Sequence, residues 1–334
     1  MNSLPDHDMF TFAEENSVEL IDETMRWRAR DVSFLKGQWS SLSKRIPCFT
    51  TEDFKAHPDG PANPYLRSVI RQPVTVTEHQ IPVGVVSNTY CMVQHAEVVE
   101  MCFKGLRENK IEPNELMCEV GLTPLGEWMN FRAYFPKQYD MNDGEKLALR
   151  LECFNSVDGS SRLVILLGWF RFVCANGLII GETKAALRDI HDENMNLEVI
   201  PEIISKGLAK VEADMKRLED WEEYSVELPK IESWVDNHLA EKWGKKAACR
   251  TLHICRTGAD AEITNPFAGG KPSERQTNRL QDVPGAAHPA KNLYDVSQAL
   301  SWLATQRNSA DERLEWQGDI TKLIENLRQH LKAA

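Results

Sequence analysis

Hydrophobic positions along the chain change from a period of two to a period near 3.6 after residue 181. Residues 146–181 are the most apolar stretch, and Asp158-Gly159 inside it is typical of a two-residue turn between paired strands, because both central positions of a type I′ turn need positive φ. Apolar side chains fall on both faces of the flanking strands. We therefore expect a hairpin inside a sheet that is covered on both sides.

The residues before this hairpin predict further strands around one amphipathic helix. Residues 74–93 and 115–135 alternate between apolar and polar positions, and the second segment is interrupted at 123–127. Between them, residues 95–110 place an apolar stripe opposite a charged face, as a helix on a core does. Residues 18–46 mix helical spacing with polar stretches, and we predict that they are partly helical.

Helical spacing dominates the last third of the chain. Helices are expected from Pro201, over 229–243 with Gly244 as the stop, over 292–305 and over 310–331. Apolar residues of the first helix repeat at steps of three and four, which fits packing on a core or self-association into a homo-oligomer: Ile204, Leu208, Val211, Met215 and Leu218. Residues 257–290, rich in Gly and Pro, predict a long exposed loop.

These patterns define an α+β fold with a mostly antiparallel central sheet and a helical C-terminal half. We expect an acidic N-terminal arm at 1–25, an α+β core domain at 26–200, and a helical region at 201–334 with a long loop at 257–290.

Composition is that of a globular protein, with 42% hydrophobic and 27% charged residues. Apolar runs are too short to cross a membrane, and the first residues lack the basic and apolar blocks of a secretory signal. The eight cysteines are scattered, which favours free thiols in a reducing compartment. We expect a cytoplasmic protein with no membrane partner.

Charge is distributed unevenly although the net charge is −11. Residues 1–25 hold seven acids and no Lys or Arg, whereas residues 26–71 hold nine basic residues against four acids. Local charge balance on a solvated surface would explain this pattern. The alternative is a surface that binds polyanions and that the acidic arm can shield.

Trp128, Arg132 and Tyr134 share one face of a predicted strand. Proteins that bind single strands use aromatic planes for bases and cations for phosphates, often on a sheet. Alternatively, the aromatic rings pack in the interior and the arginines pair with Glu152 or Glu127. The first interpretation predicts a nucleic-acid-binding site made by the basic stretch and this face: Arg26, Arg28, Arg30, Trp128, Arg132, Tyr134, Arg150 and Arg171.

Catalytic and metal-binding signals are weak. Asp158 with Glu182 and Lys184 resembles the ligand set of metal-dependent nucleases, but the turn already explains Asp158. Two further groups are incomplete or lie at a predicted helix end: Cys249, His253 and Cys255, and Asp189, His191, Asp192 and Glu193. Phosphate-loop, H-E-x-x-H, G-x-S-x-G and dinucleotide motifs are absent. We predict no catalytic residue, no metal and no cofactor, and we favour a protein that is not an enzyme.

Three segments carry a family resemblance. Residues 88–95 (NTYCMVQH), 155–161 (NSVDGSS) and 170–178 (FRFVCANGL) resemble the "Y-x-x-V-Q", "N-S-x-D-G-S" and "x-R-x-V-C-x-N-x-L" segments of the phage/plasmid-like family, domain of unknown function 932. Residues 293–300 fit the family's closing helix less well, because Asn is usual at Gln298. The resemblance implies a protein of bacteriophages and other mobile genetic elements that acts in the cytoplasm of a bacterial host, without an assigned activity.

The leading functional hypothesis is therefore a phage or plasmid accessory protein that binds nucleic acid, most simply single-stranded DNA, in recombination or replication. The alternative is a protein–protein module that counteracts a bacterial host defence system, because an acidic protein can occupy nucleic-acid sites on host enzymes. A metal-dependent nuclease is the second alternative.

Overall fold

A computed structural model describes residues 18–140, 146–171, 187–189, 191, 194–264, 270–307 and 309–333. The chain forms two compact units. Unit 1 contains the described parts of residues 1–137, 149–167 and 184–209, and unit 2 contains those of 138–148, 168–183 and 210–334. Both helices and antiparallel sheets are present, so the expected α+β class is confirmed.

A large sheet dominates unit 1, and the ends of some of its strands belong to unit 2. Among the described residues its order is β1-β2-β6-β7-β8-β9-β10. The strands are β1 (Glu19–Trp27), β2 (Arg30–Gly37), β6 (Met117–Leu122), β7 (Trp128–Asp140), β8 (Lys146–Ser156), β9 (Leu163–Arg171) and β10 (Leu187–Asp189). Buried residues follow one another along β8, so the predicted cover on both faces of the sheet is confirmed.

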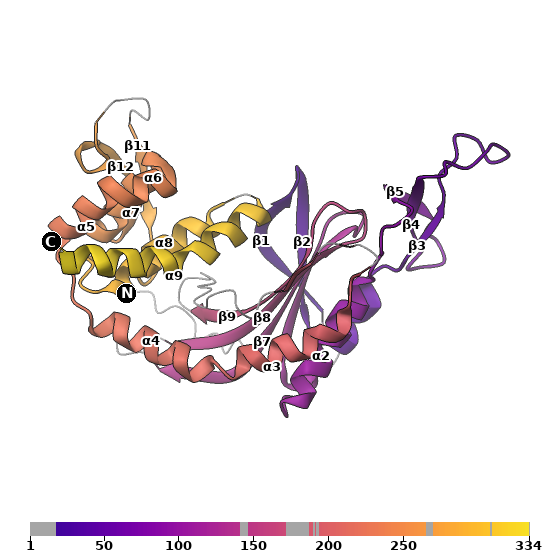
Figure 1. The fold of residues 1–334 in the computed structure, drawn as a ribbon, viewed down its shortest axis with the longest axis horizontal. Coiled ribbons are helices and arrows are strands. Elements are labelled where there is room, and N and C mark those ends of the chain that lie inside the picture. The colour runs from indigo at the N-terminus through magenta and orange to yellow at the C-terminus, as the bar shows by residue number, and fades with distance from the viewer. Residues whose placement is uncertain are drawn as a thin grey trace. The chain divides into compact units, whose positions relative to one another are not determined.

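Helices cover one face of this sheet in unit 1 (Figure 1). The elements are α1 (Trp39–Leu42), η1 (Ser43–Arg45), α2 (His95–Glu108), η2 (Pro113–Glu115), η4 (Leu197–Val199) and α3 (Ile200–Leu208). Phe103 of α2 meets Phe131 of β7 edge to face at 5.8 Å, and Trp39 of α1 contacts both rings. The predicted apolar stripe of α2 is buried as expected.

A second, three-stranded sheet forms an arm that extends from unit 1 (Figure 1). We call residues 49–87 the arm; its strands are β3 (Phe49–Asp53), β4 (Leu66–Arg71) and β5 (Ile81–Ser87). Its base is fixed by Phe49, Val69 and Val86, which pack on Val157 in the turn that follows β8. A Cβ on Gly84 would lie 2.6 Å from the Cβ of Asp158, so the arm meets the large sheet closely there.

Unit 2 is mainly helical. Its elements are α4 (Val211–Glu223), α5 (Leu228–Trp234), η5 (Val235–Leu239), α6 (Ala240–Lys242), α7 (Gly244–Thr257), β11 (Ala259–Ile263), η6 (Pro272–Glu274), β12 (Thr277–Asp282), α8 (Leu293–Thr305) and α9 (Ala310–Ala333). Indole N–H groups of Trp221 and Trp234 donate to Glu325 and Asn326 of α9. Asp260 is fully buried and accepts from Arg250 and Trp302, which ties β11 to α7 and α8.

Two local predictions in unit 1 are wrong. Within residues 18–46 only α1 and η1 are helical, so the helical spacing expected over residues 18–25 is wrong, because residues 19–25 belong to the strand β1. Residues 157–162 join β8 to β9, which is longer than the expected two-residue turn. Val157 packs in the core of the arm, and this packing favours the longer turn.

The predicted helix stop at Gly244 is confirmed, because α6 ends at Lys242 and Gly244 has a φ of +83°, the left-handed conformation that ends helices. Two other predictions about the helical region are wrong. The expected apolar seam is divided, because α3 ends at Leu208 and α4 starts at Val211. Residues 257–290 contain the hairpin of β11 and β12, where the polar strand β12 pairs with a buried β11 and so lacks an apolar period of its own.

Candidate functional site

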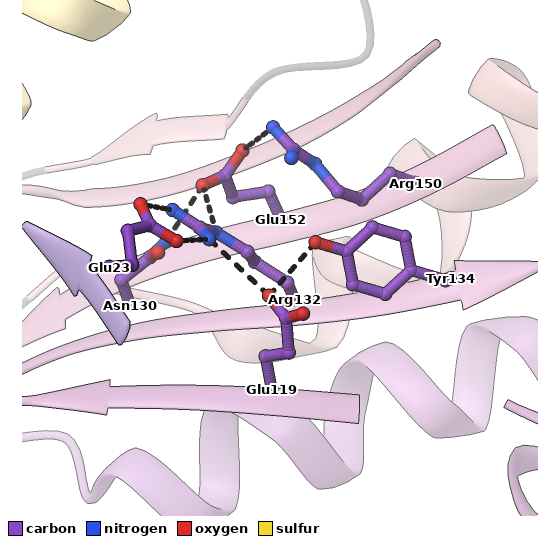
Figure 2. A network of polar contacts seen from close by, with 7 residues as sticks. All are labelled: Glu23, Glu119, Asn130, Arg132, Tyr134, Arg150 and Glu152. Carbon is purple, nitrogen blue, oxygen red and sulfur yellow. Dashed lines mark hydrogen bonds and ion pairs between the residues drawn. The ribbon is translucent and has the colours of Figure 1, made fainter. Parts of the chain in front are cut away.

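A network of charged side chains lies on one face of the large sheet, with Arg132 at its centre (Figure 2). Its members come from β1, β6, β7 and β8. The Arg132 guanidinium donates to Glu23 at 2.5 and 3.0 Å. It also donates to Glu119 at 3.3 Å and to Glu152 at 3.1 Å. One cation therefore joins carboxylates from three strands.

The same carboxylates engage the remaining polar groups of this face. Arg150 donates to Glu152 at 2.7 Å, and the Asn130 amide donates to Glu152 at 2.9 Å. The Tyr134 hydroxyl donates to Glu119 at 2.9 Å. Glu23 is the most exposed member of the network, with 27% of its side chain exposed, whereas the side chain of Glu119 is 12% exposed and the other members are buried. The network is thus a buried and mutually satisfied set of charges.

Electrostatics keeps Arg132 and Glu152 ionised. Burial alone would lower the pKa of Arg132, but Glu23 and Glu152 outweigh it, and the pKa lies well above the usual value. Burial would raise the pKa of Glu152, but Arg150 and Arg132 lower it below its usual value. Removing one partner would leave the others as uncompensated buried charges.

Trp128 is fully buried and stacks on Trp27 of β1, with ring centroids 5.0 Å apart and planes 8° apart. The expectation that Trp128, Arg132, Tyr134 and Arg150 form an exposed aromatic and basic face is therefore wrong. The alternative drawn from the sequence, in which the arginines pair with Glu152, describes the geometry better. Arg171 belongs to β9, but its side chain lies outside the described residues.

Three turns of the large sheet meet at one end, and we call residues 26–31, 123–127 and 157–162 the turn end. Arg28 donates to the carbonyl oxygen of Ser160 at 2.7 Å, and the Trp27 indole donates to the Ser160 hydroxyl at 3.1 Å. The amide of Val157 donates to the carbonyl oxygen of Glu127 at 3.0 Å. Segments that are far apart in the sequence are thereby joined at one edge of unit 1.

Exposed arginines gather at this turn end. Arg26 forms an exposed ion pair with Asp31, while Arg28 is exposed and bonds only to a carbonyl in the described part of the chain. Arg30 is half exposed and forms an ion pair with the fully buried Glu127. Arg162 is exposed on the neighbouring turn. The structure thus places Arg26, Arg28 and Arg30 on an exposed turn, whereas Arg132, Tyr134 and Arg150 of the predicted site are buried.

Sequence reasoning missed Arg162, Glu23 and Glu119. A two-residue turn at Asp158-Gly159 would put Arg162 on the face opposite Arg132 and Arg150, whereas in the longer turn it is exposed at the turn end. Glu119 had a usable signal, because it is a single charged residue inside an otherwise apolar strand. Glu23 had none, because its partner Arg132 is 109 residues away in the sequence.

The residues of the resemblance meet beside the turn end and hold it together. Both side-chain amide atoms of Gln94 bond the backbone of Phe49, at 3.0 and 2.8 Å. The Asn155 amide donates to the carbonyl of Val93 at 3.0 Å and lies 2.9 Å from Nδ1 of His95. Since Nε2 of His95 lies 2.8 Å from the carbonyl oxygen of Gly126, we assign the proton to Nε2. Burial lowers the pKa of His95 to about 4, so the ring is neutral.

Tyr90, another residue of the resemblance, donates its hydroxyl proton to the carbonyl of Ser156 at 3.1 Å and lies 3.0 Å from Nδ1 of His191. Burial raises the pKa of Tyr90 above its ordinary value, which keeps the phenol neutral. The pair therefore joins residue 191 to the β8 turn, and it does not activate the phenol as a nucleophile.

The weak metal and nuclease candidates do not assemble in the described residues. Asp158 caps its own turn by accepting from the amide of Ser160, whereas Glu182, Lys184, Asp192 and Glu193 lie outside the described residues. Cys249 contacts the carbonyl of Pro272, and His253 contacts Thr277 instead. Within the described ranges, groups of three or more His, Cys, Asp or Glu that could hold a metal ion are not found.

Comparison with protein families gives one match. The profile of a family described as a domain of unknown function, DUF932, covers residues 82–306, more than half of the 334 residues. The chain belongs to this family, which confirms the resemblance. Neither the curated proteins nor the solved structures give a match. In the described part of the chain, every helix is too short or too polar to span a membrane.

Proposed function

We propose that the chain is an accessory protein of a mobile genetic element and that it binds single-stranded nucleic acid through its turn end. The supporting observation is the gathering of exposed arginines there, from two turns that the bond between Arg28 and Ser160 holds side by side. Guanidinium groups bind phosphates through charge-assisted hydrogen bonds, and exposed ones do so without breaking the fold. The setting in recombination or replication is part of the same proposal.

Binding at the turn end should depend on Arg26, Arg28 and Arg162, which are exposed and do not compensate a buried charge. We expect Arg26→Gln/Arg28→Gln/Arg162→Gln to weaken binding of a labelled single strand and to lower the slope of log affinity against log salt by about 2, or about 0.7 for each phosphate contact. Fluorescence anisotropy at several salt concentrations measures both quantities. Arg30 is kept, because its loss would leave the buried Glu127 without its cation.

A variant with the same loss of charge elsewhere serves as the control for this experiment. Lys206, Lys210 and Lys216 are exposed, and Glu202, Glu212 and Asp214 lie near them in the sequence. Replacing these three lysines with glutamine should leave the affinity and the salt slope nearly unchanged. Equal weakening by both triple variants would show that total charge, and not the turn end, governs binding.

A second candidate function, a protein–protein module directed at a host defence protein, is favoured by the arm. Apolar side chains are exposed on it, which is typical of interaction surfaces. Tyr65 is 74% exposed, and the others are Phe54, Val74, Val76 and Val85. The strands β3 and β5 are also the edges of the small sheet in the described structure, and edge strands can pair with a partner.

If the arm binds a host protein, Tyr65→Ser/Val76→Ser should abolish recovery of that host protein from lysate. The thermal midpoint of the variant itself should stay unchanged. Both side chains are exposed, so their loss should cost the fold little. Affinity capture with tagged wild type and variant, followed by mass spectrometry, compares the two. Recovery of the same proteins by both would remove the arm as the binding surface.

A further inference from the structure

Unit 2 contains a cationic segment that the sequence alone did not single out. Residues 242–282 hold eight Lys and Arg against four Asp and Glu, a net charge of +4, in a chain whose net charge is −11. Four of these cations are engaged within the unit, in pairs with acidic residues: Lys242 with Asp319, Arg250 with Asp260, Arg256 with Glu232 and Arg279 with Asp282.

Lys245, Lys246 and Lys271 are left exposed, and we call these three residues the lysine surface. Nζ of Lys245 lies 3.5 Å from the carbonyl oxygen of Gly270, so the first turn of α7 lies beside the segment that carries Lys271. Within the described residues, none of the three makes an ion pair. Glu274 is the neighbouring acid, and its carboxylate accepts from the amide of Lys271 at 3.4 Å.

The position of Lys245 and Lys246 is electrostatically unfavourable in the isolated chain. They lie in the first turn of α7, where the helix dipole is positive, and acidic residues are absent from that turn. Elsewhere in unit 2, α4 has Glu212 and Asp214 in its first turn, which is the favourable arrangement. A negatively charged partner on the lysine surface would remove this repulsion.

We propose that the lysine surface contacts phosphates of a single-stranded nucleic acid. This inference rests on the proposed function and adds a second contact region, in unit 2, to the turn end of unit 1. The surface is not a nucleotide cradle, because Pro272 follows Lys271 where a phosphate loop needs Ser or Thr. Three flexible ammonium groups on an open surface fit a chain of phosphates, which each can contact as a point charge.

The test compares Lys245→Gln/Lys246→Gln/Lys271→Gln with wild type in titrations of a labelled single strand over a range of salt concentrations. We expect weaker binding at low salt and a salt slope smaller by about 2, as for three lost contacts of about 0.7 each. The control is the triple variant at Lys206, Lys210 and Lys216, which removes the same charge and should behave like wild type. Because the replaced side chains are exposed, the thermal midpoint should not change.

The possible failures of the two proposals are distinguishable. If wild type binds and the lysine-surface variant keeps its affinity and slope, the second contact region is overturned while the turn end stands. If the control variant loses as much as the lysine-surface variant, the effect is general and the lysine surface is again overturned. If wild type does not bind single strands at low salt, both proposals fail.

Discussion

Replacing Arg132 with alanine is expected to lower the free energy of unfolding by about 3–5 kcal/mol, which is the usual cost of removing one partner from a buried ion pair. The variant would leave Glu23, Glu119 and Glu152 facing one another without their shared cation. Arg150 would still compensate Glu152, so the largest penalty falls on Glu119. Urea denaturation followed by tryptophan fluorescence measures the loss, because Trp27 and Trp128 are buried in the same unit.

The matched control for this substitution is Arg162→Ala, in an exposed arginine at the end of the same sheet. It should change the free energy of unfolding by less than about 0.5 kcal/mol. A double variant, Arg132→Met/Glu119→Gln, should recover part of the loss, because it removes a buried carboxylate together with its cation. A loss below about 1 kcal/mol for Arg132→Ala would show that the network is hydrated and loosely held.

His95 is expected to make the protein less stable as the pH falls from 6.5 to 4. The pKa of its imidazole drops from 6.5, the ordinary value, to about 4 in the folded protein. Between these values the unfolded chain binds more protons than the folded one, so stability rises with pH and is fully present above pH 6.5. The pKa is lower by about 2.5 in the folded protein, which corresponds to a loss of about 3 kcal/mol in the free energy of unfolding at pH 4.

The pH effect is measured by urea denaturation at several pH values, in wild type and in His95→Gln. Glutamine can still donate from its amide nitrogen to the carbonyl of Gly126, as Nε2 of His95 does, but it does not titrate. Protonation of carboxylates also lowers the free energy of unfolding in this pH range, and this loss is the same in the wild type and in the variant. The wild type should therefore lose about 3 kcal/mol more than the variant. Parallel curves for the two proteins would show that His95 does not titrate in this way.

Periodicity predicted the large elements of the fold because their burial is local. The apolar stripe of α2, the strands β6 and β7 and the apolar character of β8 and β9 could each be read from a few consecutive residues. Two segments of the resemblance, residues 88–95 and 155–161, form a joint in which Gln94 and Asn155 hold separate segments, whereas residues 172–178 of the third lie outside the described residues. Gln94 and Asn155 form hydrogen bonds with backbone groups, so each position requires an amide side chain.

The site could not be predicted because its contacts are long-range. A strand with Trp128, Arg132 and Tyr134 on one face is equally suited to bind bases or to be buried, and the sequence left both alternatives open. The pairing of β1 with β2, and of β2 with β6, decides between these alternatives, because it brings Glu23 and Trp27 onto the face that carries Trp128 and Arg132. Residues 18–46 were expected to be partly helical, so these partners were not considered.

The single measurement that bears most directly on the proposed function is a titration of a labelled single strand with wild-type protein at about 50 mM salt, followed by a stepwise increase in salt. The turn end and the lysine surface predict a dissociation constant in about the micromolar range and an affinity that falls linearly with log salt. Absence of an anisotropy change up to about 100 µM protein would contradict nucleic-acid binding. The exposed arm would then stand as the principal candidate surface.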